Sequence, residues 1–152
     1  MAEHAFHETP AADAGYLVGG AALFASAFLA WVARGPGSGL RGHALIDAVV
    51  ALGRHVPAVS AGRLTILWYL LPALGAASWV TGGLSGARSR ASRVVATTAL
   101  VVTVVVVSAF VRLFGRDHVG WGPKVALLGA VALGLTAWFP HRRVDGAREH
   151  GA

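Results

Sequence analysis

The stretch TTALVVTVVVVSAFV, residues 97–111, decides the class of fold because it permits two opposite interpretations. Ten of its fifteen residues are Val or Thr, whose branching at Cβ lowers helix propensity and favours strands. In water such a segment would form a buried, aggregation-prone strand. In hydrocarbon an unpaired backbone group costs several kcal/mol, whereas these helix propensities differ by less than ~1 kcal/mol per residue. A helix satisfies its backbone internally, and the segment lacks the alternating polarity of a barrel strand. It is therefore predicted to be a membrane-spanning helix.

The composition of the whole chain agrees with a membrane environment. Of 152 residues, 55% are hydrophobic and only 13% charged, and the mean hydropathy is +0.61. Soluble domains contain roughly 25% charged residues, so this chain could not cover its apolar surface in water. The formal charge of +6 comes almost entirely from Arg. Its rich Arg, Ala, Gly and Val content indicates a bacterium with a high-GC genome, and hence the plasma (inner) membrane.

Four apolar runs are each long enough to cross a bilayer as a helix. At a rise of ~1.5 Å per residue, a hydrocarbon core of ~30 Å requires about 20 residues. The runs comprise residues 16–33, 64–84, 94–114 and 122–139. We therefore predict an all-α polytopic membrane protein with four transmembrane helices and polar tails at residues 1–15 and 140–152. The first tail has no Lys or Arg, unlike a secretory signal, so the first run is predicted to remain as an anchor.

The loop between the first two runs contains an amphipathic pattern at residues 40–56. Leu45, Val49, Leu52 and Val56 recur at spacings that align them on one helix face. We predict an interfacial helix here, which lies on the bilayer or caps the bundle.

Aromatic and basic residues bear on the boundaries and the orientation. Tyr16, Trp31, Trp79, Trp121 and Trp138 lie near the ends of the runs, where indole and phenol rings prefer the headgroup level. The densest basic cluster, at Arg88, Arg90 and Arg93, lies between the second and third runs, and further arginines follow the fourth run. The positive-inside rule therefore predicts cytoplasmic termini. Basic residues after the first run argue for the opposite orientation.

Small residues spaced four apart predict close helix packing, because lipid tails provide no hydrophobic force between helices. The predicted packing positions are Gly19, Ser26, Ala77, Ala130 and Gly134. In the second run, Pro72 and Gly75 predict a kink or hinge.

Catalytic motifs are absent from the sequence. No ionisable residue lies deep in any predicted span, whereas proton-coupled transporters need such groups as relays. The absence of Cys excludes thiolate metal sites and Cys nucleophiles. The remaining candidates for a metal or acid–base site are surface residues: His43, Asp47, His55 and His118. His43 and Asp47 are one helical turn apart, but no tight ligand spacing exists, and a solvated polar face is the simpler interpretation.

These observations predict a non-enzymatic small integral membrane protein without a cofactor, which is an accessory or scaffold subunit of a larger membrane complex or forms a homo-oligomer. Its expected partners are the lipid bilayer and either other membrane subunits or further copies of itself. Scattered basic clusters do not suit nucleic acid. The alternative is a transporter or channel for a small or lipidic solute, with Pro72 as a hinge. A metal-dependent surface enzyme or sensor is a third possibility.

Overall fold

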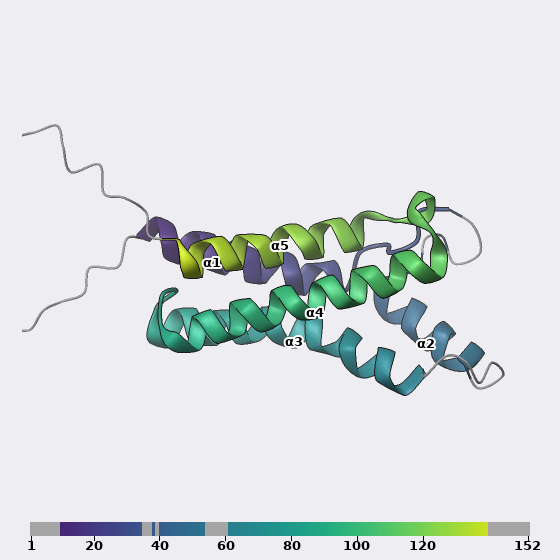
Figure 1. Ribbon diagram of the computed structural model, residues 1–152, viewed down its shortest axis with the longest axis horizontal. Helices are drawn as coiled ribbons and strands as arrows, with labels where there is room; N and C mark the ends of the chain where they lie inside the picture. The colour runs from purple at the N-terminus through teal and green to yellow at the C-terminus, as the bar shows by residue number, and fades with distance from the viewer. Residues whose placement is uncertain (1–9, 35–37, 39, 54–60, 140–152) are drawn as a thin grey trace, which may run out of the picture.

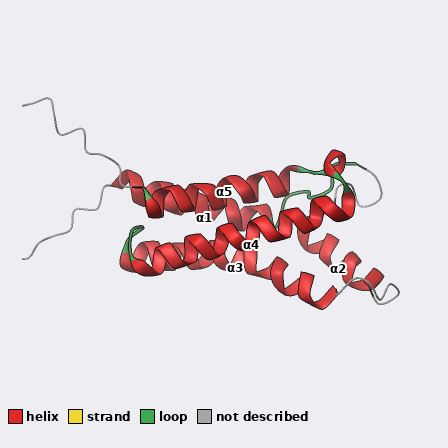
Figure 2. Cartoon of the chain, viewed as in Figure 1, coloured by secondary structure: helices red, strands yellow, loops and turns green. Residues whose placement is uncertain are grey.

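The computed structural model describes residues 10–34, 38, 40–53 and 61–139, and its regular elements there are all helical (Figure 2). Five α-helices and one short 3-10 helix follow one another along the chain. They are α1 (Pro10–Ser26), α2 (Gly42–Gly53), α3 (Ala61–Ser85), α4 (Arg90–Phe114), η1 (Arg116–His118) and α5 (Trp121–Trp138). The all-α prediction is therefore confirmed.

The Val-rich stretch forms most of α4. Ser89 caps the start of this helix, because its hydroxyl accepts a hydrogen bond from the Ser92 amide at 3.1 Å. The helix ends where Gly115 takes a positive φ of 83° and donates its amide to Val111 O. The requirement to satisfy the backbone thus outweighs the strand propensity of Val and Thr.

The four longer helices form a bundle in which each packs against two neighbours. Around the bundle the order is α1, α3, α4, α5 and back to α1. In Figure 1, α1 begins and α5 ends at the same end of the bundle as the α3–α4 turn, and α2 and η1 lie at the other end.

Close approach of glycine backbones brings α1 against both neighbours. A Cβ on Gly19 would lie 2.9 Å from Gly129 O in α5, and one on Gly129 would lie 2.8 Å from Gly19 O. On the other face of α1, a Cβ on Gly75 of α3 would lie 2.8 Å from Gly20 O. Any larger side chain at these positions would force the helices apart, so the small-residue spacing is used inside the chain.

Three of the helices are long and apolar enough to cross a membrane: Thr65–Ser85 within α3, Arg90–Phe114 and Trp121–Trp138. They overlap the second, third and fourth predicted runs. The first apolar helix is shorter, since its apolar part covers only Ala14–Ser26.

The predicted helix at residues 16–33 is wrong at its C-terminal end, because α1 stops at Ser26. Residues 27–33, which we call the interrupted segment, leave the helical path. No Gly or Pro explains this ending locally, since the first such residue is Gly35. The cause is tertiary, because backbone hydrogen bonds from the starts of α2 and α5 replace the helical ones.

Helix α2 lies within the predicted amphipathic region and packs beside α3. Leu45 and Ile46 are buried, whereas His43 and Asp47 are exposed on the opposite face. The apolar face of α2 thus covers the bundle at this end.

Helix α3 is continuous through Pro72. In Figure 1 its first half diverges from α4 towards α2. Because proline removes one backbone hydrogen bond and crowds the preceding turn, it accounts for a bend at this level.

Two of the aromatics that the sequence placed at the membrane boundary are core residues instead. Tyr16 and Trp31 are completely buried, whereas Trp79, Trp121 and Trp138 are exposed. Tyr16 Oη bonds to Thr81 Oγ1 at 3.2 Å and donates to Ser92 O at 3.1 Å, so it links α1 to α3 and α4.

Candidate functional site

The most distinctive local structure is the interrupted segment, which passes between the starts of α2 and α5. On one side Leu29 O accepts the Gly42 amide at 3.2 Å. On the other, Ala30 O accepts the Gly122 amide at 3.0 Å and Trp31 O accepts the Gly120 amide at 2.8 Å. Long-range backbone hydrogen bonds therefore replace the helical ones.

The carbonyl groups freed at the end of α1 are satisfied within the chain. The amides of Ala27, Phe28 and Leu29 form tight turns onto the carbonyls three residues earlier. Ser26 Oγ donates to Leu23 O at 2.6 Å, and Trp31 Nε1 donates to Ser26 O at 2.8 Å. Trp31 thus acts as a side-chain cap for α1, which leaves these carbonyl oxygens engaged rather than free to coordinate a solute.

Three glycines from distant parts of the sequence allow this close approach. A Cβ on Gly120 would overlap Ala30 O, and one on Gly122 would overlap the indole of Trp31. A Cβ on Gly42 would overlap Trp68 and lie 2.6 Å from Ala27 O. Alanine at any of these positions would displace the interrupted segment.

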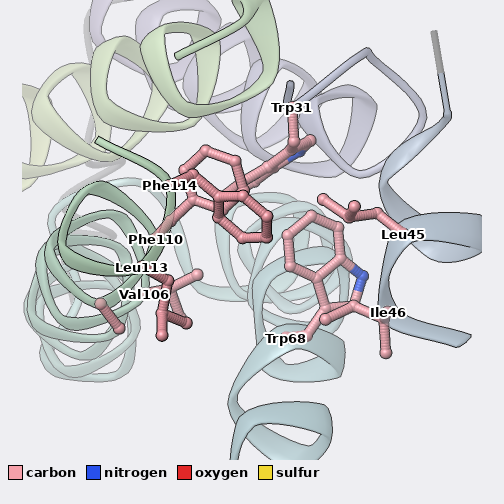
Figure 3. Close-up of a pocket in the computed structure, with 9 residues that line it drawn as sticks. Trp31, Leu45, Ile46, Trp68, Val106, Phe110, Leu113 and Phe114 are labelled. Carbon is pink, nitrogen blue, oxygen red and sulfur yellow. The ribbon is translucent and has the colours of Figure 1, made fainter. Parts of the chain in front are cut away.

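An aromatic cluster fills the space between α4 and the diverging half of α3 (Figure 3). The Trp31 ring lies edge-on to Trp68, with centroids 4.1 Å apart, and edge-on to Phe110 at 5.5 Å. Phe110 stacks on Phe114 at 4.6 Å. Such edge-on and offset arrangements are favourable beyond the area that they bury.

The cluster lines a partly open cavity of about 40 Å³. Its walls are apolar, with Leu45 and Ile46 of α2 closing one side and Val106 and Leu113 of α4 the other (Figure 3). A drug-sized ligand needs ~300 Å³ or more. The cavity is therefore too small for a substrate and is best explained as imperfect packing around the rings.

The predicted surface cluster is not assembled into a metal site by the described residues. His43, Asp47 and His118 are all exposed. No group of three His, Asp or Glu side chains able to hold a metal ion occurs in the part of the chain that the structure describes. His55 lies outside the described residues. The ring of His43 instead lies 6.4 Å from that of Phe28.

The predicted packing positions fall into two groups. Gly19, Ser26 and Ala130 lie in the interior, and Ala77 is partly buried. Gly134 differs, because a Cβ at this position would meet nothing within 4 Å. It lies on the outer surface of α5 beside the exposed Leu135.

The polar side chains buried in the described interior are hydroxyls. Ser26 and Ser78 bond back to carbonyls of their own helices, and Ser92 Oγ donates to Gly86 O at 2.7 Å. The fourth, Thr103 in the middle of α4, has no hydrogen-bond partner for Oγ1. Arg88, in the turn between α3 and α4, also has buried Nε and Nη2 atoms without a hydrogen-bond partner.

Comparisons with protein-family models, with curated proteins and with solved structures find no match for this chain. The class of the protein therefore follows from its own sequence and structure: it is an all-helical protein with helices apolar enough to cross a membrane.

One sequence signal could have indicated the contacts of the interrupted segment. Gly120 and Gly122 flank Trp121 at the start of the fourth apolar run, and a helix starting there does not require a glycine at either position. Glycines so placed indicate that another backbone or a bulky ring approaches closely. Which segment approaches them could not be inferred from the sequence.

Proposed function

We propose that this chain is a non-enzymatic integral membrane protein of four crossings, which acts as an accessory or scaffold subunit in a homo-oligomer or a larger membrane complex. The observation that carries the proposal is the contrast between its interior and its exterior. The fully buried polar residues of the described interior are Ser and Thr, and Arg88, whose Nε and Nη2 are buried, lies in the α3–α4 turn at one end of the bundle. Large apolar side chains cover the exterior. Val94, Val101, Leu128 and Leu135 are among those about half or more exposed.

The first crossing would be completed by α1 together with the interrupted segment. Non-helical backbone at membrane depth is tolerated only where protein surrounds it or water reaches it. Here Trp31 and Val32 are buried, and the carbonyls of residues 29–31 are hydrogen-bonded. In transporters, interrupted helices leave backbone groups available to bind solutes. The engaged carbonyls in this chain therefore favour a structural role over transport.

Contacts with a partner would use the outer surface of the bundle. The glycines of α1 pack against α3 and α5 within the chain, so a second protein cannot contact them. The outer face of α5 remains, with Leu128, Val131 and Leu135 exposed around the open Gly134. Orientation in the plasma membrane with cytoplasmic termini is part of the proposal and rests on the arginine-rich α3–α4 turn.

The test is the oligomeric state of the full chain, purified in mild detergent and in lipid nanodiscs and measured by light scattering. We expect a defined oligomer, or co-purification with stoichiometric membrane subunits from the native host. The variants Gly134→Leu and Gly83→Leu add bulk at two open positions on α5 and α3. Dissociation by Gly134→Leu alone would locate the interface on α5. A monomer without partners in both environments would refute the proposal.

The transporter alternative is tested separately by solute flux in proteoliposomes, with Pro72→Ala and Thr103→Val as probes. Flux that either variant changes would replace the accessory role with transport. The sequence also left open a metal-dependent surface enzyme or sensor, but the exposed positions of His43 and Asp47 do not favour it.

A further inference from the structure

An open groove lies between the start of α4 and the end of α5. Its volume is about 430 Å³, and Arg90, Arg93, Val94, Thr97, Thr98 and Trp138 line it. The Arg93 guanidinium lies over the Trp138 ring, 5.6 Å from the centroid. Trp138 Nε1 in turn donates to Thr97 Oγ1 at 3.3 Å. The ring beneath Arg93 is thus held in place by a hydrogen bond to α4.

The described lining of this groove contains two arginines and no carboxylate. Asp47 and Asp117 belong to α2 and η1 at the opposite end of the bundle, whereas Asp13 belongs to the first turn of α1 at the same end as the groove. In the adjacent α3–α4 turn, Arg88 adds a further cation whose buried Nε and Nη2 have no hydrogen-bond partner. The groove therefore complements an anion.

The side chains below the arginines are apolar and continue along α4. Val94, Val101 and Val105 fall within about 20° of one helix face, given ~100° per residue. They are 60%, 56% and 45% exposed. A small soluble anion would use only the arginines, whereas a molecule with a charged head and an apolar chain would contact both parts.

The groove also lies at the depth expected for a lipid headgroup. The 25 residues of α4 extend about 37 Å at ~1.5 Å per residue, which exceeds a hydrocarbon core of ~30 Å. At least one end of α4 must then reach the polar region, and Trp138 is a residue type that prefers this level. We propose that the groove binds an anionic phospholipid, with its phosphate between Arg90 and Arg93 and an acyl chain along Val94, Val101 and Val105. The site rests on the membrane location in the proposed function, but not on the accessory role.

The test compares binding of phosphatidylglycerol and phosphatidylcholine, with identical acyl chains, to the delipidated full chain by native mass spectrometry. We expect selective retention of phosphatidylglycerol, and roughly tenfold weaker binding in the double variant Arg90→Gln, Arg93→Gln. The matched control is Arg112→Gln, an exposed arginine in the last turn of the same helix, which should leave selectivity unchanged. A third variant, Trp138→Leu, keeps both charges but removes the ring beneath Arg93, and it should also weaken selectivity.

Three results would overturn the proposal. The first is equal retention of the two lipids by the unmodified chain, and the second is retention of phosphatidylglycerol that the double variant does not change. The third is displacement of the lipid by millimolar inorganic phosphate, which would identify a soluble-anion site. Circular dichroism of each variant confirms folding. Because the oligomeric state is measured on the same samples, loss of lipid selectivity and failure of the accessory role are separate outcomes.

Discussion

Substitution of Gly122 by Ala tests whether the close contact at the start of α5 fixes the interrupted segment. The added Cβ would overlap Trp31 Cδ1 and Nε1 and would lie 2.9 Å from Cγ. To make an ordinary contact of 3.4 Å with the added Cβ, Trp31 Cγ would have to move by about 0.5 Å, the difference between 3.4 Å and 2.9 Å. Trp31 has little room to move, because it is completely buried and its ring centroid lies 4.1 Å from that of Trp68.

The expected cost of Gly122→Ala has two parts. Overpacking of a filled core typically costs ~1–3 kcal/mol. Movement of the indole also lengthens the 2.8 Å bond from Trp31 Nε1 to Ser26 O, and loss of such a bond costs ~0.5–1.5 kcal/mol. We therefore expect the free energy of unfolding to fall by about 2–4 kcal/mol.

The matched control is Gly134→Ala, the same change in the same helix at a position with nothing within 4 Å. It should stabilise the helix by ~0.5–1 kcal/mol, because Ala has the higher helix propensity. Thermal unfolding of both variants in detergent, followed by tryptophan fluorescence, should give midpoints separated by roughly 5–20 °C. Equal midpoints would refute the reasoning, since they would show that Trp31 yields freely or does not contact Gly122.

Three further substitutions follow from individual side chains and are measured by the same thermal unfolding. Trp31→Phe removes the indole N–H that caps α1 and should destabilise the protein by at least ~1 kcal/mol; an unchanged midpoint would show that the cap contributes nothing. Tyr16→Phe removes the hydroxyl that bonds to Thr81 and Ser92 and should lower the free energy of unfolding by about 1 kcal/mol. An unchanged midpoint would show that these two bonds do not stabilise the fold. Thr103→Val replaces an unpartnered buried hydroxyl with a methyl group of similar size and should be neutral or stabilising; clear destabilisation would reveal a partner for that hydroxyl.

The class of fold could be predicted from the sequence because it depends on local and additive properties. Hydropathy and segment length identified the regions of α3, α4 and α5, and the Val-rich stretch was correctly predicted to be helical. The end of α1 could not be predicted in this way. Residues 27–33 contain no helix-breaking residue, so local propensity continued the helix to residue 33.

The candidate sites were less accessible to sequence reasoning. Spacing placed His43 and Asp47 on one face, and both are exposed in the described structure without a third ligand nearby. Arg93 and Thr97 are one turn apart in the sequence, but only the end of α5 brings Trp138 beside them. A groove formed by two helices depends on their packing, which no single run reveals.

Hydropathy and segment length were enough to predict apolar helices suited to a bilayer, because lipid as a solvent requires every backbone group to be satisfied internally. By contrast, tertiary contacts end α1 at Ser26 and make Trp31 a core residue rather than a boundary residue. The physical reason is that Gly120 and Gly122, far along the chain, offer both amide donors and the space for a close approach. Such contacts compensate for the lost helical hydrogen bonds, and they exist only once α5 has packed against α1.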